Sequence, residues 1–419
     1  MKIIPFIILM IMSLNTYAKE IHSHNEGNNT AISIKSVRGI LGENDPIAHT
    51  RAQVRAGYIS FMEDGTSRTN AYAVGGHYHF DTKRWNSIAL GLSAYTVFNL
   101  GRQQNPAYLN PDFFDVDGDS FVQLTEAYLD GKWGNTELKI GRQILNTPHA
   151  DSDDIRMISN YFEAYILKNT DIQDLSLSIG YIHKMAGWEN GVDASSFVNI
   201  GQTLDTDNID GVYYASASYD AIKDLSLSLW YYHYTNIANV LYAEAGYILH
   251  VSQTLDITFG LQYDTTKQTG DTLLQHQDAN TFGSSVEFAS EAIGVHLLMA
   301  YNKDSGDTGA SSLNLGGGAL FTSMEDQTLD AMGQAGEAWV IGLGYHFDAI
   351  GIDGLNVGVA YGDFTANNTS YYEVNELDVV MEYSFNERFS LVSAYASTHF
   401  ENQGMSDYSQ FRIISNYNF

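Results

Sequence analysis

The chain of 419 residues contains no cysteine and carries a formal net charge of −29, with a sequence pI of about 4.5. The charge excludes a general nucleic-acid-binding surface, because phosphates need basic partners, and the missing cysteines exclude a disulfide framework. Much of the acidity lies in three polar inserts, residues 109–119, 264–278 and 302–337. We expect these inserts to be solvated loops above a less charged wall.

The chain begins with a segment typical of an export signal. A single lysine precedes an apolar run from Ile3 to Leu14, and the segment ends with Thr-Tyr-Ala. This pattern predicts a cleaved signal peptide over residues 1–18, and the run is too short to span a bilayer as a helix. We expect residues 19–48 to form a periplasmic lead-in of unassigned conformation and residues 49–419 to form one outer-membrane β-barrel.

Hydrophobic residues alternate with small or polar residues along most of the remaining chain. Within residues 69–80, for example, Tyr72, Val74 and Tyr78 share one face. A period of two predicts β-strands, and the units run for about ten residues or more, the length that a tilted strand needs to cross a bilayer. Eighteen such units have centres near residues 55, 75, 92, 125, 140, 165, 180, 214, 229, 244, 259, 285, 297, 342, 358, 380, 393 and 413.

The strand count predicts an all-β fold, an 18-stranded antiparallel transmembrane β-barrel, because bacterial outer-membrane barrels have even strand numbers. Short connections, such as residues 170–174 and 220–224, alternate with mostly longer ones. This alternation is expected for periplasmic turns and outer loops. A soluble β-protein is the alternative, but a sandwich would turn its apolar face inward and use shorter strands.

A Tyr-x-Phe repeat marks one end of the predicted barrel. The repeat precedes three short turns and recurs at the end of the sequence, and aromatic rings prefer the membrane interface. We therefore expect the C-terminal strand to end on the periplasmic side. The predicted periplasmic girdle consists of Tyr78, Phe80, Tyr345, Phe347, Tyr383, Phe385, Tyr417 and Phe419.

Residues 141–164 resemble the OprD-type outer-membrane porin family, in the form found in its Campylobacter-like branch. The residues that carry the resemblance are Gly141, Arg142, Gln143, Thr147, Pro148, Asp153, Asp154, Arg156, Met157, Asn160, Phe162, Glu163 and Ala164. The resemblance implies an eighteen-stranded barrel for passive entry of small hydrophilic solutes, with the third outer loop folded inward as a constriction. Strand counting independently makes residues 146–160 the third outer loop.

Charged residues cluster in and beside this predicted loop. A pore needs fixed charges that orient a solute where the lumen is narrowest, and charges of both signs would favour small zwitterions or carboxylates. The alternative is that the charges pair with one another and only hold the loop in place. The predicted constriction residues are Arg142, Asp151, Asp153, Asp154, Arg156 and Glu163.

Strand phase separates two members of this group. The alternation places Glu163 on the lumen side, together with Tyr161 and Tyr165. Arg142 falls in phase with Ile140 and reaches the lumen only if Gly141 allows a β-bulge. Arg156 and the aspartates do not depend on a bulge.

Three arginines form a predicted basic stripe on the lumen wall. Arg51 and Arg55 on the first strand, and Arg412 on the last, alternate with apolar neighbours. First and last strands meet when a barrel closes, and a charge on the lipid side would be costly. In the family such a stripe resembles a guiding ladder for anionic groups. The alternative is that these arginines only balance acidic lumen residues.

Metal-binding and catalytic signatures are weak. Asp115, Asp117 and Asp119 surround a glycine that comes too early for an EF-hand, so a solvated acidic loop is preferred to a calcium site. His77 and His79 share a face but have no evident third ligand. Gly-x-Ser-x-Gly and His-Glu-x-x-His are absent, so we predict no metal, no cofactor and no enzymatic activity.

The sequence therefore predicts an exported outer-membrane porin for passive, partly selective diffusion of amino acids, small carboxylates and ions. Its expected partners are outer-membrane lipid, lipopolysaccharide and small polar solutes, with no nucleic acid, and it would be either a homotrimer or a monomer. A general pore, a barrel-scaffold adhesin and an outer-membrane hydrolase are the alternatives. An adhesin would need the outer loops to carry binding, and a hydrolase would need a Ser/His pair at the rim.

Overall fold

The computed structural model describes residues 47–101, 105–206, 209–402 and 404–419. The predicted signal peptide and nearly all of the predicted lead-in therefore lie outside the described residues. Strand β1 begins at Ile47, slightly before the predicted start of the barrel at residue 49. Within the described ranges, no helix is long and apolar enough to cross a membrane.

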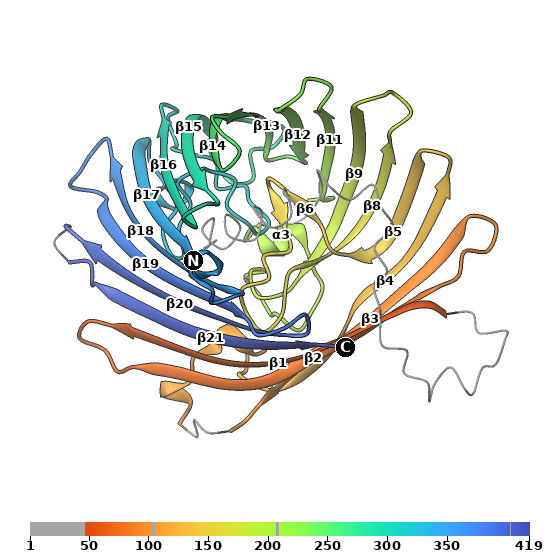
Figure 1. Cartoon of the computed structure of the whole chain (residues 1–419), viewed down its shortest axis with the longest axis horizontal. Helices are drawn as coiled ribbons and strands as arrows, with labels where there is room; N and C mark the ends of the chain where they lie inside the picture. The colour runs from red at the N-terminus through yellow and green to blue at the C-terminus, as the bar shows by residue number, and fades with distance from the viewer. Residues whose placement is uncertain (1–46, 102–104, 207–208, 403) are drawn as a thin grey trace.

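Eighteen long strands form one antiparallel sheet that closes into a barrel, because β1 pairs with both β2 and β21 (Figure 1). Each predicted strand centre lies within one of these strands, so the predicted fold class is confirmed. The barrel strands are β1 (Ile47–Glu63), β2 (Thr69–Thr82), β3 (Ile88–Asn99), β4 (Phe121–Trp133), β5 (Thr136–Gln143), β8 (Tyr161–Asn169), β9 (Leu175–Ala186), β11 (Val212–Tyr219), β12 (Leu225–Tyr234), β13 (Ala238–His250), β14 (Leu255–Gln268), β15 (Asp278–Ser290), β16 (Val295–Asp304), β17 (Gly336–His346), β18 (Leu355–Ala366), β19 (Glu373–Ser384), β20 (Phe389–Phe400) and β21 (Tyr408–Asn418).

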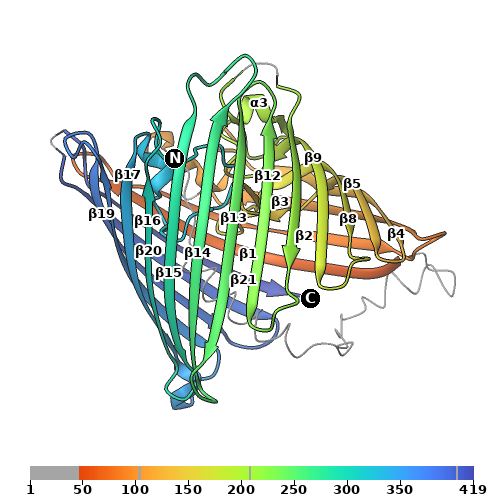
Figure 2. The same ribbon diagram turned by 90° about the horizontal axis from the view of Figure 1, so that it is seen from above.

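The remaining elements are short and lie in the connections. Figure 2 shows the barrel strands side by side and tilted, with α3 near one end of the barrel. These short elements are β6 (Asn146–Thr147), β7 (Ala150–Asp151), β10 (Val198–Asn199), α3 (Ile200–Thr203) and the 3-10 helices η2 (Pro106–Tyr108), η3 (Pro111–Phe113), η4 (Leu329–Met332) and η5 (Phe347–Ile350).

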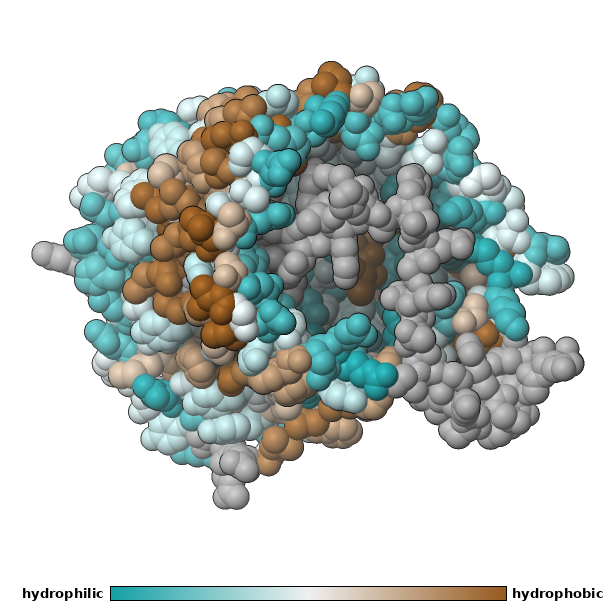
Figure 3. Space-filling model, viewed as in Figure 1, coloured by the Kyte–Doolittle hydropathy of each residue, from teal (hydrophilic) through white to brown (hydrophobic). Residues whose placement is uncertain are grey.

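The outer surface of the barrel is apolar because alternate strand residues point outward. Leu261, Leu343 and Leu377 are exposed, whereas their strand neighbours Gln262 and Glu376 are buried on the inner side. Figure 3 shows hydrophobic residues gathered on the outer surface around the strands that Figure 1 labels β16 to β18. A transmembrane barrel needs this pattern, with apolar residues toward lipid and polar residues toward the lumen.

Four long outer connections matter for the site, and we name them L2 (residues 100–120), L3 (144–160), L4 (187–211) and L7 (305–335). Figure 1 shows the yellow L3 and the teal L7 inside the ring of strands. Strand counting correctly made L3 the third outer loop.

The sequence predicts that the acidic insert over residues 302–337 is a solvated loop above the wall. The structure contradicts this prediction. Leu320, Phe321 and Met324 of L7 are buried in one apolar cluster with wall residues Val340 and Phe364. Burying such side chains stabilises the inward position of L7 by about 1.5–3 kcal/mol for each one. The prediction is wrong because it weighted the acidic residues of the insert and overlooked this apolar segment.

Candidate functional site

L3 crosses the inside of the barrel between β5 and β8. The small hairpin β6–β7 begins the loop, and Ala150 pairs with Leu315 of L7 in a parallel bridge. Further along the loop, Met157 packs against Gly57 of β1, where a Cβ would come within 2.7 Å of its sulfur. L3 therefore touches L7 at one point and the opposite wall at another.

Asp154 connects the tip of L3 to the wall at β1. Its two carboxylate oxygens accept hydrogen bonds of 2.6 and 2.8 Å from the Arg55 guanidinium. Arg55 also donates to the Arg156 carbonyl at 2.7 Å and to the Asn416 side chain at 2.7 Å. The partial loss of water around Asp154 would alone raise the pKa of its carboxyl, but the positive charge of Arg55 holds this pKa below its usual value. Asp154 is therefore ionised and bound to the wall.

Arg156 carries a guanidinium that is only partly satisfied. The guanidinium carbon lies 4.6 Å from the centre of the Trp188 ring in L4, and Nε is 3.7 Å from the Asp112 carboxylate in L2. Nε and Nη1 are buried and have no hydrogen-bond partner among the described residues. Burial and the neighbouring Arg412 lower the pKa of Arg156. A buried donor without a partner is rare in native proteins, so the Arg156 guanidinium retains unused hydrogen-bonding capacity.

Asp153 and Asp151 differ from Asp154 because, in the described residues, no arginine donates a hydrogen bond to either carboxylate. The Asp151 side chain accepts from the Asp153 backbone N–H at 2.8 Å, and Trp188 donates to the Asp153 carbonyl at 3.0 Å. Burial and the negative Glu189 raise the pKa of Asp153 well above its usual value. Burial raises the pKa of Asp151 to about 6. The pKa shifts of the three predicted aspartates therefore differ in direction, raised for Asp151 and Asp153 and lowered for Asp154.

Arg142 and Glu163 do not join this group. They are directly paired on β5 and β8, with 3.6 Å between Arg142 Nε and a Glu163 carboxylate oxygen. Two residues along each strand, Ile140 pairs with Tyr165, which is 48% exposed on the outer face. The period of two puts Arg142 and Glu163 on that same outer face. The predicted lumen position of Glu163 is wrong, because the outward-facing Tyr165 was taken to face the lumen.

The bulge that Arg142 would need is absent at Gly141. Pairing of β5 runs without interruption from Thr136 to Gln143 against β8. The register shifts instead between Ser93 and Ala94, and between Glu163 and Ala164, where the partner strands carry the extra residue. Arg142 stacks on the Phe197 ring of L4 at 4.2 Å and donates to the backbone of β4.

The three arginines of the predicted basic stripe lie on adjoining strands with inward phase. Arg412 pairs with Ile59 across β1 and β21 and donates two hydrogen bonds to Glu325 of L7, at 2.6 and 3.0 Å. Arg55 is bound to Asp154 of L3. Arg55 and Arg412 therefore each hold a loop against the wall. Arg51 is exposed and pairs with His79 across the sheet.

The inner wall also contributes carboxylates that the sequence analysis did not identify. Asp378 of β19 accepts from the Glu325 backbone N–H at 3.0 Å, and Glu376 accepts from the Asp326 N–H at 2.7 Å. Burial raises the pKa of Asp326 to about 7, although Arg156 opposes this shift. The signal for these residues was present in the sequence, because Glu376 and Asp378 alternate with the outward-facing Leu377.

The Tyr-x-Phe pairs lie where predicted relative to the short turns. The ring centres of Tyr345 and Phe347 are 4.8 Å apart, and those of Tyr383 and Phe385 are 4.1 Å apart. The ring centres of Tyr417 and Phe419 are 4.8 Å apart. Tyr78 is exposed and Phe80 follows it near the end of β2, and Phe419 is exposed as well. The assignment of these rings to a periplasmic girdle stays a prediction.

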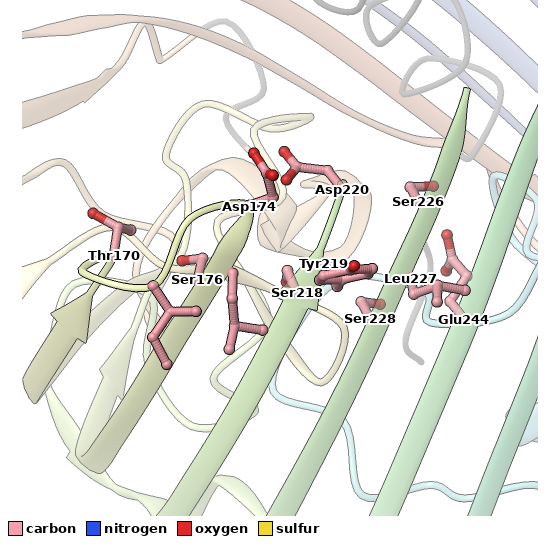
Figure 4. Close-up of a pocket in the computed structure, with 12 residues that line it drawn as sticks. Thr170, Asp174, Ser176, Ser218, Tyr219, Asp220, Ser226, Leu227, Ser228 and Glu244 are labelled. Atoms are coloured by element: carbon pink, nitrogen blue, oxygen red, sulfur yellow. The ribbon is translucent and has the colours of Figure 1, made fainter. Parts of the chain in front are cut away.

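A hollow opens on the barrel wall beside the short turns that follow β8 and β11 (Figure 4). Its volume is about 540 Å³, and serine hydroxyls form much of its lining. Figure 4 shows the Asp174 and Asp220 carboxylates close together, with Ser218, Ser228 and Glu244 further along the wall. This hollow lies on strands that face the β1–β21 junction across the barrel.

Few side chains in the described residues could hold a metal. His276, Asp278 and Asp307 have ligand atoms within 4.8 Å of one another, but Asp278 already pairs with Lys267. His79 lies between two carboxylates, 2.9 Å from Glu126 and 3.1 Å from Asp81, while His77 packs on Tyr95. The pair His77 and His79 therefore does not converge on a shared ligand. Asp115 accepts from the backbone N–H groups of Asp117 and Asp119, which is the geometry of a local turn.

Comparison with known proteins identifies relatives of this chain. A family model described as outer membrane porin, OprD family, matches residues 108–419. OpdK from Pseudomonas aeruginosa is similar in structure, with a TM-score of 0.74, 18% identity, and coverage of 88% of this chain and 99% of that chain. OccAB3 from Acinetobacter baumannii gives a TM-score of 0.76, 14% identity and coverage of 89% and 100%. A search of curated protein sequences finds no match.

The structural likenesses establish the fold, and the family match covers most of the chain. The eighteen-stranded barrel with an apolar exterior and loops inside the lumen agrees with that match. The family consists of channels, which conduct solutes without chemical conversion. The chain therefore belongs to the OprD family of outer membrane porins, and it is a channel of the bacterial outer membrane and not an enzyme.

Proposed function

We propose that L3 forms the constriction of this porin and that its charges select among small hydrophilic solutes, namely amino acids, small carboxylates and ions. The observation that carries the proposal is the ion pair of Asp154 with Arg55, which ties the tip of L3 to the wall. A loop that enters the lumen and is fixed at its tip narrows the passage. The lumen is closed within a single chain, so either a monomer or a homotrimer would conduct in this way.

The charges around L3 support passage of molecules that carry a carboxylate. Arg51 is exposed on the wall, and two donor groups of the buried Arg156 have no hydrogen-bond partner within the part of the chain that the structure describes. The Asp154 side chain is half exposed, so it faces passing solutes while it is bound to Arg55. Positive and negative groups close together would orient a zwitterion in transit. A solved structure of OpdK contains vanillate, and that ligand is also a carboxylate.

Planar-bilayer recordings test the role of L3. Arg156→Ala should lower the permeability of anions relative to cations, because it removes a positive charge from the proposed constriction. Asp154→Asn should shift the reversal potential in a salt gradient toward anions. Asp153→Asn is the comparison variant, because burial and Glu189 raise the pKa of Asp153, so this substitution should remove less charge than Asp154→Asn. Folded Arg156→Ala and Asp154→Asn proteins with unchanged conductance and selectivity would contradict the proposal.

Liposome-swelling rates test the solute class. We expect amino acids and small carboxylates to enter faster than neutral sugars of similar size, and Arg156→Ala to reduce this preference. Equal rates for charged and neutral solutes of one size would indicate a general pore.

A further inference from the structure

His149 of L3 lies at a point where L3, L7 and the barrel wall meet. Its side chain is 1% exposed. The ring atom Nε2 is 2.6 Å from a carboxylate oxygen of Asp264 on β14, and Nδ1 is 2.8 Å from the Leu313 carbonyl oxygen of L7. One imidazole thus connects three separate parts of the chain.

Backbone contacts surround this imidazole. The Leu315 N–H donates to the His149 carbonyl at 2.9 Å, next to the parallel bridge between Ala150 and Leu315. Tyr234 of β12 donates to the Leu313 carbonyl at 2.9 Å. The His149 ring therefore occupies the junction at which L3 and L7 run side by side.

The two contacts of the ring require a proton count. A carbonyl oxygen can only accept, so Nδ1 must carry hydrogen to bond Leu313. Nε2 then bonds the carboxylate either as an imidazolium N–H or as the acceptor from a protonated Asp264. Both arrangements contain one proton shared between His149 and Asp264. Without that proton, a nitrogen lone pair would face a buried carboxylate at 2.6 Å, and a buried polar group without a partner is costly.

We propose that His149 is a positioning residue that holds L3 against L7 and the wall through one proton shared with Asp264, so that loss of this proton releases the junction. The effect on the ion current rests on the proposed role of L3 as the constriction. The release of the junction itself does not depend on that role.

The direction of the pH response follows from the surroundings of the ring. Burial alone would lower the pKa of His149, but the Asp264 carboxylate and the Leu313 carbonyl raise it above its usual value. Tyr232 on β12 and Tyr242 on β13 contact the ring edge-on. The other titratable groups nearby are Tyr234 on β12 and Asp330 in L7. A raised pKa means that the junction is complete at acidic pH and is lost as pH rises through the folded pKa.

Asp264→Asn is the informative variant. Asparagine can donate its amide N–H to Nε2 of a neutral imidazole whose Nδ1–H still bonds Leu313, so the junction forms without a shared proton. The variant therefore keeps the contact and removes its dependence on pH. His149→Leu is the second variant, and it removes both ring contacts at every pH.

Hydrogen exchange in the purified protein measures the junction directly. The Leu315 amide donates across the junction, so its exchange should accelerate in the wild type by up to about tenfold for each pH unit between the ordinary imidazole pKa and the higher folded pKa, relative to Asp264→Asn at the same pH. The comparison at equal pH cancels the intrinsic dependence of exchange on hydroxide. His149→Leu should exchange fast throughout. Equal exchange profiles for the wild type and Asp264→Asn would overturn the proposal.

Conductance recorded at the same pH values separates this proposal from the proposed constriction. A current change with rising pH in the wild type, absent in Asp264→Asn, supports both. Faster exchange of Leu315 without a current change supports the junction and contradicts L3 as the constriction. Because the chain contains no cysteine, Ala150→Cys with Leu315→Cys can lock the junction by a disulfide. A pH response of the current that is equally large in the oxidised and reduced forms would contradict L3 as the constriction, because locking the junction would then have no effect on the passage.

Discussion

Replacing Arg55 should free the tip of L3 from the barrel wall. Arg55 is 3% exposed and donates to the Asp154 carboxylate, to the Arg156 carbonyl and to Asn416. Arg55→Met keeps much of the side-chain volume and removes all of these donors. The barrel strands β1 and β21 keep their backbone pairing, so the change should act on L3 and leave the barrel folded.

The hydrogen bonds of Arg55 set the free energy that anchors the tip of L3 to the wall. Hydrogen bonds to charged groups contribute about 1.5–3 kcal/mol each in net terms. The side chain of Asp154 is 50% exposed, so water can replace part of what is lost, and solvent screening places the anchoring energy near the low end, at about 2 kcal/mol. A difference of about 2 kcal/mol changes the ratio of docked to released L3 by roughly 30-fold.

Single-channel recording can read this ratio as the fraction of time spent in the main conductance level. Arg55→Met should increase current fluctuations and weaken ion selectivity. Asp154→Asn is the matched partner, and the double variant completes a cycle in which the effects should not add, because both substitutions break the same contact. Steady current with unchanged selectivity in a folded Arg55→Met protein would refute the reasoning. Fully additive effects would refute the direct coupling of the two residues.

Three further predictions concern L7. Because the pKa of Asp326 is about 7, its carboxyl is mostly neutral at pH 6 and mostly charged at pH 8. The cation preference measured from reversal potentials should therefore rise between these pH values, and Asp326→Asn should reduce the rise. Gly316→Ala should displace L7, because Gly316 has a φ of +90° and an added Cβ would lie 2.4 Å from the Asn160 amide nitrogen. Altered conductance and faster proteolysis of L7 would show the displacement, and wild-type behaviour would contradict it. Arg412→Met should leave Glu325 as a buried unpaired charge and lower the free energy of unfolding by about 3–5 kcal/mol. A lower thermal unfolding temperature in detergent would show this loss, and a second substitution, Glu325→Gln, should restore the temperature as the control.

The strands could be predicted from the sequence because a transmembrane barrel imposes a strict local rule. Each residue faces either lipid or lumen, so apolar and polar residues alternate over lengths set by the bilayer. This alternation did not predict orientation correctly where the residues on the two faces of a strand could not be told apart by polarity. Tyr165 and Glu163 lie in phase, and an aromatic residue suits either side, so only the neighbouring strands determine that both point outward.

The loops could not be predicted in the same way because their contacts are between distant parts of the chain. His149 contacts Asp264 and Leu313, and Arg55 contacts Asp154, yet nothing local in the sequence indicates these partners. The motif around L3 suggested an inward loop through resemblance alone. L7 offered an apolar segment as a physical signal, and the acidic residues around it obscured that signal.

The inward position of L7 is encoded by the wall as much as by the loop. Glu376 and Asp378 accept from backbone N–H groups of L7, so they fix the path of the loop whatever side chains the loop carries at those positions. The Glu325 side chain is neutralised by Arg412. An acidic residue in this barrel can therefore hold a loop without contributing a free charge to the passage.

The net charge of −29 is for this reason a poor guide to ion selectivity. Asp154 is paired with Arg55, burial raises the pKa of Asp153, and two donor groups of Arg156 have no hydrogen-bond partner among the described residues. Charges on the outer loops are screened over about 8 Å at physiological salt. The local balance around L3 is therefore more positive than the composition suggests, and a preference for carboxylates is compatible with a strongly acidic chain. As pH rises past the values for Asp151 and Asp326, about 6 and 7, that balance should move toward cations.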